Sequence, residues 1–271
     1  YPAGVARIQV TDEQLLRYSR HILLDTLGIK GQERILAAHA LVVGAGGLGS
    51  PATLYLASAG VGTITLVDDD SVDFTNLQRQ ILHTRDRVGM AKAESGRQAL
   101  AAINPDIVIV PLQRRLAGAE LDSLVAIADV VLDCSDNFAT RHAINRACVR
   151  HRKALVSGAA IRFDGQISVY DLRREDSPCY HCLFPEGEDV DELRCAVMGV
   201  FAPLTGIIGT MQAAEALKLV AGIGESLTGR LLLLDTLEMV WRTVKFRKDA
   251  GCAICGLHGD RSYANSTCRS A

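Results

Sequence analysis

The sequence carries little net charge: its 29 basic and 31 acidic side chains leave a formal charge of −2. Proteins that bind a nucleic-acid backbone or an anionic membrane as their general partner typically show a basic excess. We therefore expect neither a nucleic acid nor a membrane among the partners. Internal repeats and low-complexity segments are also missing. At 271 residues, the chain is long enough to bury most of its apolar surface without help from disulfides.

The sequence also lacks the apolar segments that target or anchor a protein. Its start, YPAGVARIQVTDEQ, has no apolar run flanked by basic residues, so we predict no signal peptide and a cytoplasmic protein. Residues 196 to 214 contain no charged side chain, and a segment of that length could span a bilayer. Its glycines and Pro203, followed by the amphipathic QAAEALKLV, instead predict a turn and then a buried helix.

The part of the chain from residue 36 to residue 160 alternates between apolar runs and helical patterns. Such alternation predicts a parallel sheet with crossover helices. The expected strands are residues 40–43, 63–68, 107–112, 130–134 and 154–159, and the expected helices are residues 51–60, 92–103, 119–128 and 140–151. We therefore predict an α/β fold built on a Rossmann-like, doubly wound, mainly parallel sheet.

The pattern changes after residue 160. Residues 164–172 alternate like an antiparallel strand, and residues 230–246 suggest two more strands, so the sheet should continue into a mixed, antiparallel C-terminal half. An amphipathic helix is expected over residues 12–27, with Thr11 as its N-cap. The predicted segments are a helical one (1–35), a nucleotide-binding half (36–160), a mixed half (161–256) that includes an acidic loop (183–194), and a polar tail (257–271).

The glycine-rich stretch LVVGAGGLGS follows the first expected strand. Gly44, Gly46 and Gly49 fit the G-x-G-x-x-G pattern, whose backbone amides and helix N-terminus receive an anion. Asp68 ends the next strand, where a carboxylate commonly accepts hydrogen bonds from ribose hydroxyls. These features alone would suit an oxidoreductase that uses NAD(P) or FAD.

The segment DDDSVDFTNLQRQ, residues 68 to 80, favours a nucleoside triphosphate instead. A dehydrogenase has no use for the polar cluster of Asn76, Gln78, Arg79 and Gln80 that follows the second strand. Arg79 offers a planar fork of donors for phosphate oxygens, and Lys92 offers a compact charge at the start of a helix. Both follow strand ends, and ligands of open α/β sheets lie at that edge.

The same edge receives DCSDN, residues 133 to 137. Carboxylates beside a triphosphate repel it unless a divalent cation lies between them, and one or two carboxylates plus phosphates hold Mg²⁺ in this way. Asp136 is the candidate ligand for magnesium, and Asp133 is as suited to capping or orienting a neighbour.

Four of the eight cysteines form two Cys-x-x-Cys pairs, Cys179 with Cys182 and Cys252 with Cys255. In a cytoplasmic protein such pairs indicate metal or redox chemistry rather than structural disulfides. Four thiolates could close a tetrahedral zinc site, provided that the fold brings the distant pairs together. Two redox-active dithiols and an iron–sulfur cluster remain open as alternatives.

Taken together, these motifs resemble those of the MoeB/ThiF/HesA family, bacterial relatives of the ubiquitin-activating enzymes. The resemblance rests on GAGGLG, VDDDSVDFTNLQRQ, Lys92, DCSDN, SGAAIRFDGQ, CYHC, GVFAPLTGIIGTMQAAEALK and GCAICG, and it runs from about residue 12 to residue 256. It implies adenylation, with ATP as donor, of the C-terminal Gly-Gly carboxylate of a ubiquitin-like sulfur carrier that is MoaD- or ThiS-like. The pathway would be molybdopterin synthesis, thiamine thiazole synthesis or both.

The resemblance also assigns residues. It implies structural zinc on the four paired cysteines and a homodimer in which Arg20 reaches the ATP of the neighbouring subunit. Cys195 would accept the carrier or its sulfur, or else be an unreactive cysteine. A separate protein such as a cysteine desulfurase or a rhodanese would deliver the sulfur. The expected nucleotide site comprises Gly44, Gly46, Gly47, Gly49, Asp68, Asp70, Thr75, Asn76, Leu77, Gln78, Arg79, Gln80, Lys92, Asp136 and Asn137.

A third reading is a scaffold that binds the carrier without turnover. The intact set of predicted phosphate contacts disfavours it, since a scaffold has no need of Arg79, Lys92 and Asp136 together.

Overall fold

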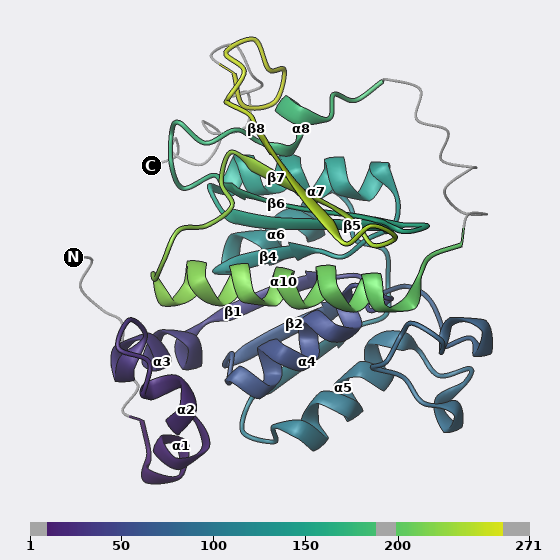
Figure 1. Cartoon of the computed structure of the whole chain (residues 1–271). Coiled ribbons are helices and arrows are strands. Elements are labelled where there is room, and N and C mark those ends of the chain that lie inside the picture. The colour runs from purple at the N-terminus through teal and green to yellow at the C-terminus, as the bar shows by residue number, and fades with distance from the viewer. Residues whose placement is uncertain (1–9, 188–198, 257–271) are drawn as a thin grey trace, which may run out of the picture.

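The protein is described by a computed structural model that covers residues 10–187 and 199–256, and these residues form one eight-stranded sheet with helices on both faces (Figure 1). The strand order is β3-β2-β1-β4-β5-β6-β7-β8. Strands β1 to β5 pair in parallel, and β6, β7 and β8 add to the edge of β5 as antiparallel strands. The predicted Rossmann-like sheet with an antiparallel continuation is confirmed.

The strands and helices lie close to their expected ranges. The strands are β1 (His39–Val43), β2 (Thr63–Val67), β3 (Val108–Leu112), β4 (Val130–Asp133), β5 (Ala154–Ile161), β6 (Asp164–Asp171), β7 (Arg230–Asp235) and β8 (Val240–Lys245). The helices are α1 (Asp12–Arg17), α2 (Ser19–Ile22), α3 (Gly28–Ala37), α4 (Gly49–Ala59), α5 (Lys92–Ile103), α6 (Gly118–Ile127), α7 (Phe138–His151), α8 (Tyr180–Leu183) and α10 (Ala202–Ala221), with short 3₁₀ turns at Phe74–Asn76 and Arg85–Arg87.

The two faces of the sheet bury two separate apolar cores. Successive side chains of a strand point to opposite faces, so Ala40 and Val42 of β1 pack on the side of α4 and α10, while Leu41 and Val43 pack on the side of α6 and α7. Because both faces are covered, the central strands read as continuous apolar runs rather than alternating ones.

The long helix α10 corrects one prediction. A turn was expected before the helix at QAAEALKLV, but α10 begins at Ala202 and runs through Gly206 and Gly209. Gly209 serves helix packing, because a side chain there would collide with the carbonyl of Leu48 and would lie 2.6 Å from the ring of Pro51. The glycine therefore permits close approach of α10 to α4, the helix drawn just below it in Figure 1.

The expected helix over residues 12–27 is broken into α1 and α2. Thr11 caps α1 as predicted, through a capping box with Gln14. The break falls at Tyr18, whose side chain is 4% exposed and accepts a hydrogen bond from Nδ2 of Asn104 at 2.9 Å. The ring of Tyr18 is buried against residues of the sheet domain, and the amphipathic helix is interrupted at this residue.

Some predictions fall on residues that lie outside the described ranges: Cys195, the acidic loop beyond residue 187 and the tail from residue 257. In the parts of the chain that are described, we find no helix both long and apolar enough to cross a membrane. The division of the chain into four segments stays a prediction.

Candidate nucleotide site and metal centre

The glycine-rich turn joins β1 to the N-terminus of α4. Gly44 has a φ of 102°, and a side chain there would lie 2.6 Å from the carbonyl oxygen of Cys134. Only glycine suits this position, because other residues rarely adopt such a backbone and the neighbouring strand leaves no room for a Cβ. The turn thus brings the backbone of β1 against the end of β4 and directs the first amides of α4 toward the carboxyl edge of the sheet.

Asp68 holds this turn in place. Its Oδ2 accepts a hydrogen bond from the backbone amide of Ala45 at 2.7 Å, and its Oδ1 accepts one from the amide of Asp70 at 2.9 Å. Burial raises the pKa of Asp68, and the nearby charge of Lys92 acts in the opposite direction. His83 supports the turn from behind, with Nε2 2.9 Å from the carbonyl of Ala45.

A cleft of about 740 Å³ opens at the carboxyl ends of β1, β2 and β4 and extends over β5, β6 and β7. This volume lies within the range of small-molecule and cofactor sites. Predicted site residues that line it are Gly44, Gly46, Gly47, Asp68, Asp70, Arg79, Gln80, Lys92, Asp136 and Asn137. The structure therefore gathers residues from five separate stretches of the chain at one edge of the sheet.

Two cations face this cleft in different settings. Lys92 is 4% exposed at the first position of α5, and its Nζ lies 2.8 Å from Oδ2 of Asp70. Arg79 is half-buried, and its guanidinium donates to Oδ1 of Asn76 at 2.9 Å. Buried lysines are rare unless they are paired. The pairing with Asp70 therefore allows the charge of Lys92 to be buried at the wall of the cleft.

Gln80 is the clearest sign that a polar ligand belongs here. The residue is 5% exposed, lines the cleft and has an Oε1 that finds no hydrogen-bond partner among the described residues. Buried polar atoms are nearly always paired in folded proteins. An orphaned amide oxygen beside Gly46 and Arg79 thus fits a site completed by a ligand with donor groups.

The two acidic residues of DCSDN have separate roles. Asp133 is 1% exposed, and its carboxylate accepts hydrogen bonds from the hydroxyls of Ser135 at 2.6 Å and Ser157 at 2.8 Å. It orients neighbours, as one reading of the sequence expected. Asp136 is exposed at the cleft, and the following Asn137 caps α7 by accepting from the amide of Thr140 at 2.9 Å. Oδ1 of Asp136 accepts a long hydrogen bond from Nδ2 of Asn137 at 3.5 Å, and the exposed carboxylate can meet a cation at this edge.

Some predicted residues do not line the cleft, namely Gly49, Thr75, Asn76, Leu77 and Gln78. Asn76 instead fixes the guanidinium of Arg79. Arg20 is exposed on α2 and is absent from the cleft wall. Its contact with a neighbouring subunit stays a prediction.

The sequence interpretation missed three arginines in the cleft. Arg114 and Arg115 follow the end of β3, and Arg141 lies on α7, where it donates to the carbonyl of Ser135 at 2.8 Å. The position of Arg114 and Arg115 just after a parallel strand was the signal that could have revealed them.

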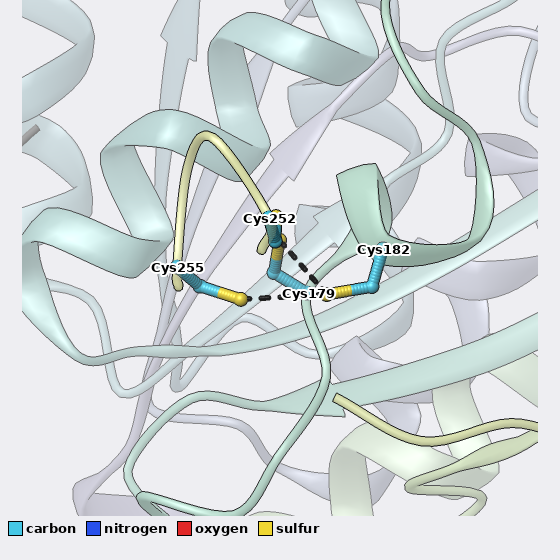
Figure 2. Close-up of side chains that lie close together, drawn as sticks. All are labelled: Cys179, Cys182, Cys252 and Cys255. Carbon is cyan, nitrogen blue, oxygen red and sulfur yellow. Dashed lines mark hydrogen bonds between the residues drawn. The ribbon is translucent and has the colours of Figure 1, made fainter. Parts of the chain in front are cut away.

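The fold brings the four paired cysteines together, although the two pairs lie far apart in the sequence (Figure 2). Sγ of Cys179 lies 3.9 Å from that of Cys182 and 3.7 Å from that of Cys252, and Cys182 lies 3.4 Å from Cys255. A tetrahedral site with zinc–sulfur bonds of about 2.3 Å requires sulfurs about 3.8 Å apart. The observed separations are therefore compatible with zinc.

The chemistry of these thiols also favours a cation. Hydrogen bonds that the Cys179 thiol donates to neighbouring sulfurs, that of Cys182 first, together with burial raise the pKa of Cys179. A coordinated divalent metal would reverse such a shift by stabilising thiolates. Asn145 of α7 orients the cluster, since its Nδ2 lies 3.6 Å from Sγ of Cys179 and its Oδ1 accepts from the amide of Tyr180. None of the four cysteines lines the nucleotide cleft.

The other described cysteines, Cys134 and Cys148, are buried, and burial raises the pKa of each thiol. A nucleophilic cysteine needs a stabilised thiolate, so neither is suited to covalent catalysis at neutral pH.

An open α/β sheet with an anion-binding glycine turn, a triphosphate-sized cleft and a remote cysteine cluster defines a class of nucleotide-binding enzymes. The ThiF family model matches residues 18–254. The chain is 46% identical to the sulfur carrier protein ThiS adenylyltransferase of Escherichia coli (strain K12), over 91% of this chain and 97% of that protein. It is also 46% identical to the molybdopterin-synthase adenylyltransferase of the same organism, over 92% and 99%. The chain belongs to the ThiF family.

Solved structures of more distant proteins share the fold. E. coli MccB with ATP matches with a TM-score of 0.77 at 24% identity, over 89% of this chain and 73% of that one. The protein PaaA matches with a TM-score of 0.76 at 20% identity, over 91% and 77%.

Proposed function

We propose that this protein uses ATP to adenylate the C-terminal carboxylate of a small ubiquitin-like sulfur carrier, releasing pyrophosphate. The observation that carries the proposal is the meeting of Arg79, Lys92 and Asp136 in one cleft at the carboxyl edge of the sheet. The chain is also 46% identical to two named adenylyltransferases. Had these three residues been far apart, the hypothesis of a triphosphate site would have been wrong.

The reaction suits a site that has cations but no catalytic dyad. A terminal carboxylate has a reference pKa of about 3.5, so it is already ionised at neutral pH and needs no general base. One of its oxygens attacks the α-phosphorus of ATP, the bond from that phosphorus to the bridging oxygen breaks, and pyrophosphate departs. Positioning and electrostatic stabilisation supply most of the catalysis in such transfers.

The residues of the cleft divide this work. The fork of Arg79, fixed by Asn76, and the ammonium of Lys92 would bind phosphate oxygens. The amides of the glycine turn, held by Asp68, would add neutral donors. Asp136 would hold Mg²⁺, which supplies charge neutralisation when bound.

The cleft continues away from these groups over β5, β6 and β7, where Ala159, Ala160 and Gly165 form part of the wall. Small side chains leave room for an extended peptide with little side-chain bulk of its own. This part of the cleft is our candidate for the carrier's glycine-rich tail, and Phe201, half-exposed beside Phe163, lies in the segment that leads into α10.

Zinc on Cys179, Cys182, Cys252 and Cys255 would be structural in this scheme. It would join the segment after β6 to the segment after β8, and it has no part in the adenylation.

Arg20 and the homodimer require a separate test. If Arg20 acts on the partner's site, a mixture of two inactive variants, Arg20→Ala and Lys92→Ala, should regain about a quarter of the wild-type exchange rate through mixed dimers. No recovery after subunit exchange, with mixed dimers verified by differently tagged chains, would show that Arg20 does not act across an interface.

An oxidoreductase remains the alternative from another class, because the glycine turn and Asp68 also suit a dinucleotide. An oxidoreductase would not explain why Arg79, Lys92 and Asp136 lie together in the cleft. Equilibrium dialysis with ATP and with NAD would separate the two, and tighter binding of NAD would count against adenylation.

The decisive experiment is carrier-dependent exchange of pyrophosphate into ATP, run with a MoaD-like and a ThiS-like carrier in turn. We expect exchange in the wild type and its loss in Arg79→Ala and Lys92→Ala, both folded. Arg97→Ala is the matched control, since Arg97 lies on α5 with Lys92 but pairs with Glu94 on the outer surface. Exchange retained in both cleft variants would remove these residues from the mechanism.

The same assay bears on the pathway, because one relative named above is a ThiS adenylyltransferase and the other a molybdopterin-synthase adenylyltransferase. We propose that a separate sulfur donor, such as a cysteine desulfurase or a rhodanese, serves the activated carrier. Trapping a carrier conjugate and locating it by mass spectrometry would test Cys195 as its acceptor.

A further inference from the structure

Two histidines and a glutamate gather beside the cysteine cluster but outside it. His142 lies on α7, His181 lies in α8 between two of the cysteines, and Glu186 follows α8. One ligand atom from each lies within 4.8 Å of the others. Neither the nucleotide cleft nor the four-cysteine cluster uses these side chains.

His142 is the anchor of this group. It is 4% exposed, and its ring lies edge-on to the rings of Tyr180 at 5.3 Å and His181 at 5.8 Å. No hydrogen bond of its ring nitrogens is found among the described residues. A neutral imidazole keeps one nitrogen lone pair, and a metal ion is a ligand that can accept it.

The other two members offer acceptor atoms at the same place. The amide of Glu186 donates to Nδ1 of His181 at 3.3 Å, so this nitrogen carries a lone pair in a long and replaceable bond. Oε2 of Glu186 accepts from Arg146 at 2.7 Å, which leaves Oε1 available. Arg146 would therefore orient the carboxylate without occupying both of its oxygens.

We propose that His142, His181 and Glu186 form a second metal site, for a divalent transition-metal ion such as Zn²⁺. Two imidazoles and one carboxylate are a set that such ions accept, and they leave a fourth position for water. Hard cations such as Mg²⁺ prefer all-oxygen sites.

The site needs a modest closure. Ligand atoms around zinc lie about 3.3 Å apart when the bonds are about 2.0–2.1 Å, so any separation near the 4.8 Å limit of this group must shorten. His142 is fixed by its burial, whereas His181 is half-buried and Glu186 is exposed, so these two side chains can move toward it. The bound metal would tie α7 to the chain after α8. The proposed metal ligand His142 directly follows Arg141, which lines the nucleotide cleft. The metal site would therefore lie next to the wall of that cleft.

Cobalt is a suitable probe because its absorption reports the ligands. The full-length protein would first be treated with a mild chelator and its tightly held zinc counted, and then titrated with Co²⁺ in excess Mg²⁺. We expect one further ion per chain, with weak visible bands and without the intense near-ultraviolet band of thiolate-bound cobalt. This readout is independent of adenylation, so it can fail while the proposed function stands, and the reverse.

Variants of the more exposed members keep the test separate from folding. His181→Gln and Glu186→Gln should each weaken cobalt binding about tenfold or more, with the tight zinc unchanged. His151→Gln, on the same helix α7 but paired with Asp122, is the matched control and should bind as the wild type does. Arg146→Gln should weaken binding less than Glu186→Gln does, because the carboxylate is kept and only its orienting partner is lost.

Three outcomes would overturn the proposal. They are no uptake of cobalt beyond the tight zinc, a thiolate band on the added ion, and wild-type affinity in both His181→Gln and Glu186→Gln.

Discussion

Nζ of Lys92 lies 2.8 Å from Oδ2 of Asp70, and the lysine side chain is 6% exposed while that of the aspartate is 67% exposed. The ammonium is therefore held inside the cleft wall by a carboxylate that reaches in from the surface. A buried charge is tolerated only when it is paired. Asp70 therefore pairs with Lys92 when no nucleotide is bound, and a phosphate of the nucleotide would replace it.

Replacing Asp70 with asparagine tests this exchange of partners. We expect Asp70→Asn to lower the free energy of unfolding without nucleotide by about 1–2 kcal/mol, since the lysine keeps only a neutral acceptor. ATP should bind the variant more tightly, because the phosphates no longer compete with a carboxylate. Denaturant melts with and without ATP measure both effects. Asp176→Asn, whose carboxylate pairs with Arg174 at 2.9 Å and does not line the cleft, is the control. Equal stability and equal ATP affinity in Asp70→Asn and the wild type would refute the idea.

Asn76 is expected to act only through Arg79, because its Oδ1 holds the guanidinium 2.9 Å away and the side chain does not line the cleft. Asn76→Ala should raise the KM for ATP several-fold, and Arg79→Ala should lower exchange about a hundredfold. In the double variant, loss of Asn76 should add nothing. Independent, additive effects would mean that Asn76 contacts the nucleotide itself, as the sequence interpretation had it. Arg85→Ala, at a neighbouring arginine that lies over Phe74, controls for loss of charge.

Gly44→Ala should destabilise the protein by about 2–4 kcal/mol, because the new Cβ must occupy a left-handed backbone 2.6 Å from the carbonyl oxygen of Cys134. Gly206→Ala is the matched control within α10, where a Cβ meets no atom within 4 Å, and it should stabilise by about 0.5–1 kcal/mol. Thermal melts of the two variants measure the contrast. A Gly44→Ala variant as stable as the wild type would show that the turn can relax.

His83 makes the stability of the nucleotide half depend on pH. Burial lowers the pKa of His83 below its ordinary value of 6.5, with the carbonyl of Ala45 opposing the shift. The unfolded chain therefore takes up a proton first as pH falls. The stabilisation is complete above pH 6.5 and is lost below it, with a slope of at most about 1.4 kcal/mol per pH unit.

His83→Gln should flatten that acid limb in denaturant melts between pH 7 and pH 5, values chosen to bracket the ordinary histidine pKa. His39, whose pKa burial also lowers, should account for part of the remaining slope. The pKa of Asp68 is raised, so its protonation acts in the opposite direction, and the difference between variant and wild type is the proper measure. An unchanged slope in His83→Gln would contradict the assignment.

Cys255→Ser should remove the tightly held zinc and lower the free energy of unfolding by about 3 kcal/mol or more, because the metal joins two distant segments only in the folded state. Elemental analysis and melts with and without a strong chelator measure both changes. Cys148→Ala serves as the control, since this buried cysteine lies outside the cluster. Reduced, freshly purified wild type without zinc would overturn the site.

The agreement between sequence and structure is greatest where local chemistry decides the backbone. Thr11 caps its helix, Gly60 ends α4 with a φ of 87°, and the apolar runs become the central strands. Prediction failed where packing against residues distant in sequence decided the structure. Tyr18 is buried against Asn104, which breaks the expected helix. Gly209 lies inside α10 because α4 packs closely against it.

The sequence by itself determined the alternation of strands and helices, the glycine turn, the cationic and acidic groups at strand ends and the two cysteine pairs, since each depends on a short stretch whose residue types limit its conformation. Only the tertiary structure decided that Asp70 holds Lys92, that Asn76 supports Arg79, that Arg114, Arg115 and Arg141 join the cleft, and that His142 meets His181 and Glu186. Apart from the pairing of Asn76 with Arg79, these contacts join residues far apart along the chain, and all of them depend on how side chains pack in the folded protein.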